Sequence, residues 1–329
     1  MSALLDVVGL RVRFNSRAEA VRGVSIAVEK GETHCLVGES GCGKSVSSLA
    51  VMGLLAKGGI RTADRMTFAG QDLLGLSERD MSRLRGDKMA MIFQEPMTSL
   101  NPAYTVGSQM AEVRTRHRGG SRREAMDRAA ALLGRVGITA PGMRLAQFPH
   151  QLSGGLRQRV MIAMALMCDP ELLIADEPTT ALDVTVQAQI LRLLMELQRE
   201  LGLAILLITH DLGIVARMAN RVSVMYAGEV VESATAEALF AAPTHPYTRG
   251  LLECVPIPGK VARGAPLGSI PGTVPRIPLG FAGCGFRDRC AFADASCAVA
   301  VPHQSRIPGH DYACRLPAGW IAAGEVKAA

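Results

Sequence analysis

The sequence predicts an α/β protein with a mainly parallel sheet core and a loop-rich C-terminal appendage. Short apolar runs bounded by turn or charged residues resemble buried strands; they are His34–Val37, Met89–Phe93, Leu172–Ala175 and Ala204–Ile208. Segments with helical spacing lie between them, and such alternation is typical of a parallel sheet. Eleven of the 17 prolines lie at or after Pro243, where regular elements are therefore not expected.

The change in composition near residue 240 divides the 329 residues into two predicted domains, 1–240 and 241–329. At the start of the first domain, Leu4–Val28 alternates as strands do, which predicts an antiparallel β subdomain beside the core. The charged, helical stretch Arg114–Arg135 predicts a helical subdomain at about residues 83–165.

The sequence argues against a membrane-spanning, a secreted and a nucleic-acid-binding protein. No apolar run approaches the ~20 residues of a spanning helix. The N-terminus also lacks the basic start and apolar stretch of a signal peptide, so we expect a cytoplasmic chain. The net charge of +6 is small and spread along the sequence, so nucleic-acid binding is not expected.

Eight consecutive residues match the spacing of a phosphate-binding P-loop; they are Gly38, Glu39, Ser40, Gly41, Cys42, Gly43, Lys44 and Ser45. They follow an apolar strand and precede a helix-like run, as this motif requires. Glycines let backbone N–H groups turn toward phosphate oxygens, and the helix N-terminus adds partial positive charge. We expect Lys44 to reach the β- and γ-phosphates and Ser45 to hold Mg²⁺.

An acidic pair follows another predicted strand. Asp176 and Glu177 come directly after Leu172–Ala175. Asp176 suits a water-mediated contact to Mg²⁺, and Glu177 suits orienting or deprotonating an attacking water. Alone, such a pair is usually a helix cap or a solvated turn. Together with the P-loop it predicts a nucleotide hydrolase.

A second anion-binding helix start lies just upstream of that strand. Ser153, Gly154 and Gly155 open a predicted helix, and helix N-termini bind anions. Because one ATP does not need two γ-phosphate cradles, we expect this one to serve a nucleotide held by a partner.

Residues 1–240 resemble the ATP-binding-cassette (ABC) ATPases, because these motifs follow one another along the chain in the order found in that family. The remaining motifs are Gln94 in Ile-Phe-Gln-Glu-Pro, Thr180–Asp183, and His210 in Ile-Thr-His-Asp. The resemblance implies that Gln94 senses Mg²⁺ and the attacking water and connects the nucleotide to membrane subunits. It also implies that His210 contacts the γ-phosphate.

The resemblance further implies a head-to-tail pair of cassettes, in which each ATP lies between one P-loop and the partner's Ser153–Gly155. Asp183 would lie at the interface between the two ATPase subunits. Phe14, the aromatic residue before the P-loop, would stack on adenine, although a phenylalanine at the end of a strand often belongs to the core.

Three parts of the sequence resemble the ATPase subunits of oligopeptide and dipeptide importers; they are Ile92–Pro102, His245–Leu252 with the Ile270–Pro275 that follows it, and the cysteine-containing tail. This implies an ATP-hydrolysing translocase that is a peripheral protein at the cytoplasmic face of the inner membrane. The implied partners are a second homologous ATPase subunit in a heterodimer, two transmembrane permeases and an extracytoplasmic binding protein. The alternatives are an importer of nickel, opine or glycoside cargo, or a soluble cassette ATPase outside transport.

Half of the eight cysteines lie in the tail, at Cys284, Cys290, Cys297 and Cys314. No pair has the two-residue gap of a zinc ribbon, so the residues leave zinc, an iron–sulfur cluster and unrelated thiols open. The resemblance favours a [4Fe–4S] cluster, with zinc as the second choice.

Overall fold

The computed structural model describes residues 3–14, 18–95, 99–180, 182–255, 268–318 and 320. Residues 96–98 of the segment Ile92–Pro102, and Ala181 of Thr180–Asp183, lie outside this description. The chain divides into two compact units. Unit 1 comprises Met1–Leu4, Val28–Thr33 and Phe68–Ile208, and unit 2 comprises Leu5–Ala27, His34–Thr67 and Thr209–Ala329. Within the described ranges, no helix has the length and apolar character needed to cross a membrane.

Unit 1 is built on three parallel strands, β7 (Met89–Ile92), β8 (Leu172–Asp176) and β9 (Ala204–Thr209), in the order β9-β8-β7. Every residue of β8 and β9 is buried. Strands buried on both faces read as continuous apolar runs, which is why these strands could be predicted from the sequence. The short strand β6 (Gln71–Asp72) also belongs to unit 1.

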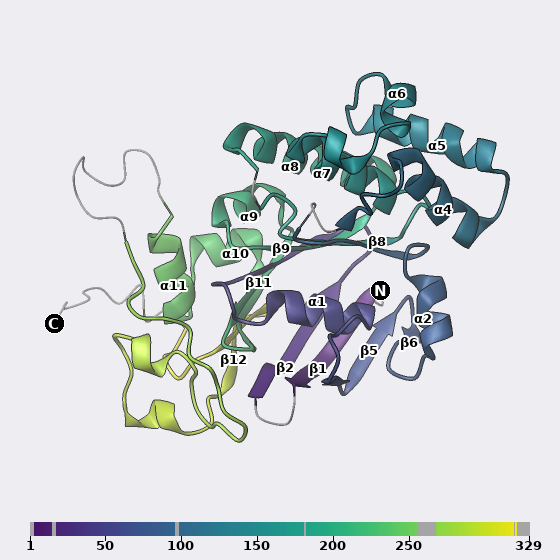
Figure 1. Cartoon of the computed structure of the whole chain (residues 1–329). Helices are drawn as coiled ribbons and strands as arrows, with labels where there is room; N and C mark the ends of the chain where they lie inside the picture. The colour runs from purple at the N-terminus through teal and green to yellow at the C-terminus, as the bar shows by residue number, and fades with distance from the viewer. Residues whose placement is uncertain are drawn as a thin grey trace. The chain divides into compact units, whose positions relative to one another are not determined.

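The helices of unit 1 are drawn in blue and teal in Figure 1; they are α2 (Glu78–Leu84), α4 (Val106–Arg118), α5 (Arg122–Arg135), α6 (Pro141–Leu145), η1 (Pro149–Gln151), α7 (Gly154–Ala165) and α8 (Val184–Leu201). Helices α4 to α7 pack on one another. Strand β7 lies inside the predicted range 83–165, and helices α4 to α7 follow it within the same range. Ser121 starts α5 with a capping box to Glu124, which satisfies two backbone donors.

Unit 2 contains two groups of strands. The first group is β1 (Leu5–Phe14), β2 (Ala18–Val28), β4 (Gly59–Thr62) and β5 (Arg65–Phe68). β1 lies between β2 and β5 and also pairs antiparallel with β4. The prediction of strands over Leu4–Val28 is therefore confirmed.

The second group is β3 (Thr33–Val37), β10 (Arg221–Tyr226), β11 (Glu229–Thr235), β13 (His310–Ala313) and β12 (His303–Ile307), in that spatial order. β3 and β10 are parallel, and the other pairs are antiparallel. The helices of unit 2 are α1 (Lys44–Met52), α9 (Leu212–Met218), α10 (Ala236–Ala241), α11 (Pro246–Glu253), η2 (Arg287–Arg289) and η3 (Ala295–Ala298). Together, the parallel strands and helices of the two units confirm the α/β class.

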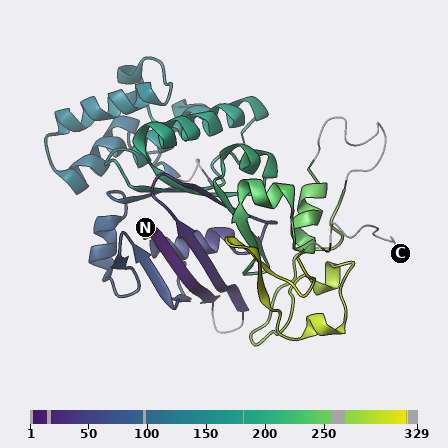
Figure 2. The same ribbon diagram turned by 180° about the vertical axis from the view of Figure 1, so that it is seen from behind.

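The C-terminal region is more regular than its prolines predicted. β12 and β13 form a hairpin, and β13 extends the sheet by pairing with β11, with Tyr312 opposite Glu232. Figure 2 shows this yellow hairpin beside the green strands. Pro302 and Pro308 flank β12, so they bound the strand and remove no hydrogen bond from its interior.

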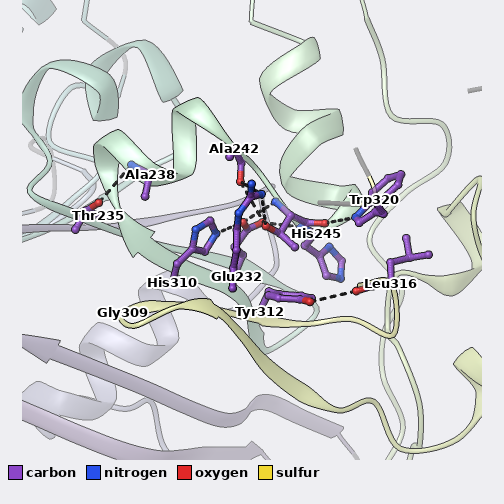
Figure 3. Close-up of polar contacts among 12 residues, drawn as sticks. Glu232, Thr235, Ala238, Ala242, His245, Gly309, His310, Tyr312, Leu316 and Trp320 are labelled. Atoms are coloured by element: carbon purple, nitrogen blue, oxygen red, sulfur yellow. Dashed lines mark hydrogen bonds and ion pairs between the residues drawn. The ribbon is translucent and has the colours of Figure 1, made fainter. Parts of the chain in front are cut away.

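A buried carboxylate ties the C-terminal region to β11. Glu232 is fully buried and accepts hydrogen bonds from the backbone N–H of Thr244 (2.7 Å), that of His245 (2.8 Å) and Nε2 of His310 (2.7 Å) (Figure 3). A buried carboxylate is tolerated only where donors replace its water. These three donors come from the start of α11 and from β13, so the carboxylate holds both elements against β11.

Candidate functional site

The turn between β3 and α1 has the backbone of a phosphate cradle. Gly38, Gly41 and Gly43 have φ values of 153°, 82° and 104°, which side chains rarely permit. A Cβ at Gly38 would lie 2.1 Å from the carbonyl oxygen of Met225, and one at Gly43 would lie 2.5 Å from that of Ala20. Both positions therefore require glycine.

Lys44 begins α1 and places its ammonium inside this loop. The residue is 4% exposed, and its Nζ donates to the carbonyl oxygens of Gly38 (2.8 Å) and Glu39 (3.0 Å). Ser45 is half-buried in the first turn of the same helix. A Cβ at Gly41 would meet nothing within 4 Å, so the loop is open there. A buried cation at a helix N-terminus beside an open glycine turn fits the phosphates of a nucleotide.

In unit 1, the acidic pair lies at the end of β8. Asp176 and Glu177 are 4% and 9% exposed. One carboxylate oxygen of Glu177 accepts hydrogen bonds from Nε2 of Gln94 (3.0 Å) and Oγ1 of Thr180 (3.0 Å). Glu177 also has a φ of 44°, an uncommon left-handed conformation for a residue with a side chain. The structure thus joins Gln94 to Glu177, the two residues expected to act on the attacking water.

The predicted second anion site is an exposed helix start in unit 1. Ser153 caps α7 by accepting the N–H of Leu156, and both Ser153 and Gly154 are exposed. Gly155 packs against Val186, where a Cβ would lie 2.8 Å from Cγ1. Asp183 is exposed and caps α8 by accepting the N–H of the same Val186 (2.9 Å). The N-termini of α7 and α8 therefore lie together.

The two remaining predicted ligands lie in unit 2. His210 is exposed and immediately follows β9, and Asp211 caps α9 by accepting the N–H of Gly213 (2.8 Å). Phe14 is half-buried at the end of β1, opposite Gly59. A Cβ at Gly59 would lie 2.8 Å from its ring. The stacking of Phe14 on adenine and the contact of His210 with phosphate stay predictions.

The four tail cysteines lie near enough for their charges to influence one another. Burial first, then the thiols of Cys314, Cys290 and Cys297, raise the pKa of Cys284 to about 11. The range that includes all four contains no group of three or more His, Cys, Asp or Glu residues able to hold a metal. The prediction of an iron–sulfur or zinc site is therefore not supported by the positions of these side chains.

Two residues beside the P-loop were not predicted. The N–H of Glu39 donates to the hydroxyl of Tyr247 (2.9 Å), and Nη1 of Arg289 lies 3.0 Å from each carboxylate oxygen of Glu39. Burial raises the pKa of Tyr247, so its hydroxyl stays protonated. The two residues follow Glu39 by 208 and 250 positions, and no local pattern connects them to it.

Comparison with known families gives two matches. A family model described as ABC transporter matches residues 21–180. A second model, described as the C-terminal region of oligopeptide/dipeptide transporters, matches residues 231–297.

Curated relatives match over nearly the whole chain. A Brucella melitensis protein named as a peptide import ATP-binding protein is 52% identical over 320 residues, covering 93% of this chain and 95% of its own. The dipeptide transport ATP-binding proteins DppD of Bacillus subtilis and Escherichia coli are each 49% identical, covering 96% of this chain and 95% and 97% of their own.

Two solved structures of ABC proteins are similar to this chain in fold. The chain of cbiO1 from Clostridium perfringens, part of the ABC transporter complex cbiONQ, has a TM-score of 0.64 at 28% identity, covering 73% of this chain and 92% of its own. The dimeric ATP-binding cassette MJ0796, solved after hydrolysis with ADP and phosphate bound, has a TM-score of 0.63 at 26% identity, covering 70% and 98%.

Proposed function

This chain belongs to the ABC transporter family, and from this premise we propose that it is the ATP-hydrolysing subunit of an importer for di- or oligopeptides. The observation that carries the peptide assignment is the match of residues 231–297 to the C-terminal region of oligopeptide/dipeptide transporters. In support, the relatives named for peptide or dipeptide transport cover at least 93% of the chain. Residues 1–240 would form the cassette and residues 241–329 a peptide-importer domain.

The proposed chemistry assigns a task to each described side chain. In unit 2, the P-loop and Lys44 bind the phosphates, Ser45 holds Mg²⁺, and His210 contacts the γ-phosphate. In unit 1, Asp176 holds Mg²⁺ through water, and Glu177 accepts a proton from the water that attacks phosphorus. The hydrogen bonds from Gln94 and Thr180 orient the Glu177 carboxylate for that task. Mg²⁺, when bound, neutralises charge that develops on the phosphate oxygens.

We propose that the exposed starts of α7 and α8 serve a nucleotide held by a second, homologous ATPase subunit. Ser153 and Asp183 are exposed N-cap residues of these helices, and an exposed helix N-terminus can bind an anion that another subunit holds. The similar cassette MJ0796 is itself dimeric. The assembly would add two permeases and an extracytoplasmic binding protein, with this chain peripheral at the cytoplasmic face of the inner membrane. The alternatives are nickel, opine or glycoside cargo, and a soluble cassette ATPase.

The split site predicts slow ATP hydrolysis by the isolated chain. It is expected to co-purify with two integral membrane permeases, and phosphate release should increase when the second ATPase and a peptide-loaded binding protein are added. Ser153→Arg should lower this stimulated rate by about tenfold or more, because the larger side chain blocks the anion site. Loss of the cap itself costs about 1 kcal/mol of stability.

Ser121→Arg is the matched control, because Ser121 is also an exposed helix cap, at α5. It should change the stimulated rate less than about twofold, since the two variants share only the cost in stability. A monomer that hydrolyses ATP at the full rate without partners would contradict the split site. Stimulation by a nickel-loaded or glycoside-loaded binding protein, and not by a peptide-loaded one, would replace the peptide assignment.

For the cysteine segment we propose an iron–sulfur cluster, with zinc as the alternative, completed when metal binding deprotonates the thiols. What supports it is the gathering of four thiols whose charges influence one another. Anaerobically purified protein is expected to be brown, with about four irons per chain. Cys290→Ser should abolish the colour, whereas Cys254→Ser, at a half-buried cysteine outside the segment, should keep it. Colourless protein with stoichiometric zinc would select zinc, and metal-free protein would refute both.

A further inference from the structure

Two side chains of the C-terminal region, Tyr247 and Arg289, contact Glu39 of the P-loop, and only Arg289 binds its carboxylate. We propose that Arg289 is a positioning residue for nucleotide binding, which acts by holding and neutralising the carboxylate of Glu39 inside the phosphate loop. This rests on the proposed nucleotide site at Lys44 and adds a residue that lies outside the cassette motifs.

The side chain of Arg289 is held in place by contacts other than the one with Glu39. Its Nε donates to the carbonyl oxygen of Pro271 (2.6 Å) and its Nη2 to that of Ile270 (3.1 Å). Its Nη1 donates to both carboxylate oxygens of Glu39 and lies 3.3 Å from the hydroxyl of Tyr226. The Arg289 side chain is only 7% exposed. A planar guanidinium held this way presents its remaining donors in one direction.

Glu39 is held at three points, and one of them is the P-loop lysine. Its N–H donates to Tyr247, its carbonyl oxygen accepts from Nζ of Lys44, and its carboxylate accepts from Arg289. A shift of Glu39 would therefore move an acceptor of the Lys44 ammonium. Arg289 is thus connected to the ammonium of Lys44 through Glu39, by one hydrogen bond to the Glu39 carboxylate and one to its carbonyl oxygen.

A cluster of three aromatic rings supports this contact. Tyr226 and Tyr247 have ring centroids 4.6 Å apart, and Phe286 lies 5.2 Å from the first and 5.3 Å from the second. The guanidinium of Arg289 lies 5.8 Å from the centroid of Tyr226 and 6.0 Å from that of Phe286. Phe286 and Arg289 come from the stretch between Cys284 and Cys290, so this stretch packs directly on the base of the P-loop.

Charge makes this role distinct from simple packing. The Glu39 carboxylate, whose side chain is 28% exposed, is a negative charge in the loop that would receive phosphate, and like charges repel each other. Arg289 cancels that charge. Removing Arg289 should therefore weaken ATP binding, and removing the charge of Glu39 as well should restore it.

The experiment measures the dissociation constant of a fluorescent ATP analogue, and the melting temperature in parallel, with the full chain. Arg289→Met should weaken binding by about tenfold or more, as loss of a charge-assisted pair implies. Glu39→Gln in the Arg289→Met background should recover most of that loss. Arg289→Lys should lose less, because it keeps the charge without the fork.

Arg287→Met is the matched control, two positions away in η2. Arg287 pairs with its neighbour Asp288, lies over Phe281 and donates to the carbonyl oxygen of Ala282, and none of these residues belongs to the P-loop. It should change ATP affinity less than about twofold.

Three results would overturn the proposal. One is an Arg289→Met chain that binds ATP normally. Another is a loss that Glu39→Gln does not reduce, because packing alone would then explain it. If Lys44→Ala also binds ATP like the unaltered chain, the nucleotide site itself is misplaced, and the role of Arg289 falls with it. Should Arg289→Met fail to fold, Arg289→Lys with and without Glu39→Gln makes the same comparison.

Discussion

Replacing Glu177 with Gln is expected to reduce ATP hydrolysis by about 100-fold or more, because an amide cannot accept the proton of the attacking water. ATP binding should persist, since the amide oxygen can still accept the hydrogen bonds that Gln94 and Thr180 now donate. The measurement pairs phosphate release at saturating ATP with a binding titration. Both are made on the assembled complex, where the rate is highest.

Glu171→Gln is the matched control for this substitution. Glu171 immediately precedes β8, as Glu177 immediately follows it, but its carboxylate is 37% exposed and pairs with Lys88 at 3.0 Å. A surface ion pair of this kind contributes about 0–1 kcal/mol to stability, so this variant should hydrolyse ATP normally. Equal hydrolysis by the unaltered chain and Glu177→Gln would remove Glu177 from the chemistry.

The second large effect is expected from Lys44→Ala, which should weaken ATP binding by about 10- to 100-fold. Hydrogen bonds to charged groups contribute about 1.5–3 kcal/mol each, and the buried ammonium is the only lysine cation in residues 38–45. The variant also removes the bonds from Nζ to the carbonyl oxygens of Gly38 and Glu39. The melting temperature should therefore be measured beside the ATP titration.

Lys57→Ala provides the comparison, because Lys57 is exposed in the turn after α1. It removes the same side chain from the same unit without touching the loop, so ATP affinity should stay within about twofold. If both lysine variants bind ATP with unchanged affinity, Lys44 does not bind the phosphates.

The local motifs could be predicted because their geometry depends on neighbouring residues. The P-loop requires glycine at Gly38 and Gly43 whatever surrounds it, since each turns the backbone into a conformation that side chains resist. The strands β8 and β9 are short apolar runs buried on both faces, and that pattern is visible without any partner. Membership of the ABC family follows from the order of such motifs, and the comparisons confirm it.

The C-terminal region could be predicted only in part. Proline content indicated loops, but it could not show that Pro302 and Pro308 would fall just outside a strand. The clustering of four cysteines indicated a shared site, but whether their side chains come together as ligands depends on the folded chain, and residues 268–318 contain no group of three or more metal-binding side chains.

The sequence by itself determined the phosphate loop and the acidic pair, because each depends on residues within a few positions of one another, and the order of such local motifs along the chain determined the family. Only the tertiary structure decided that Gln94 donates to the carboxylate of Glu177, and that Arg289 and Tyr247 hold Glu39. Side chains separated by 83 to 250 positions meet only after the sheets and helices have packed, and sequence periodicity describes neighbours along the chain.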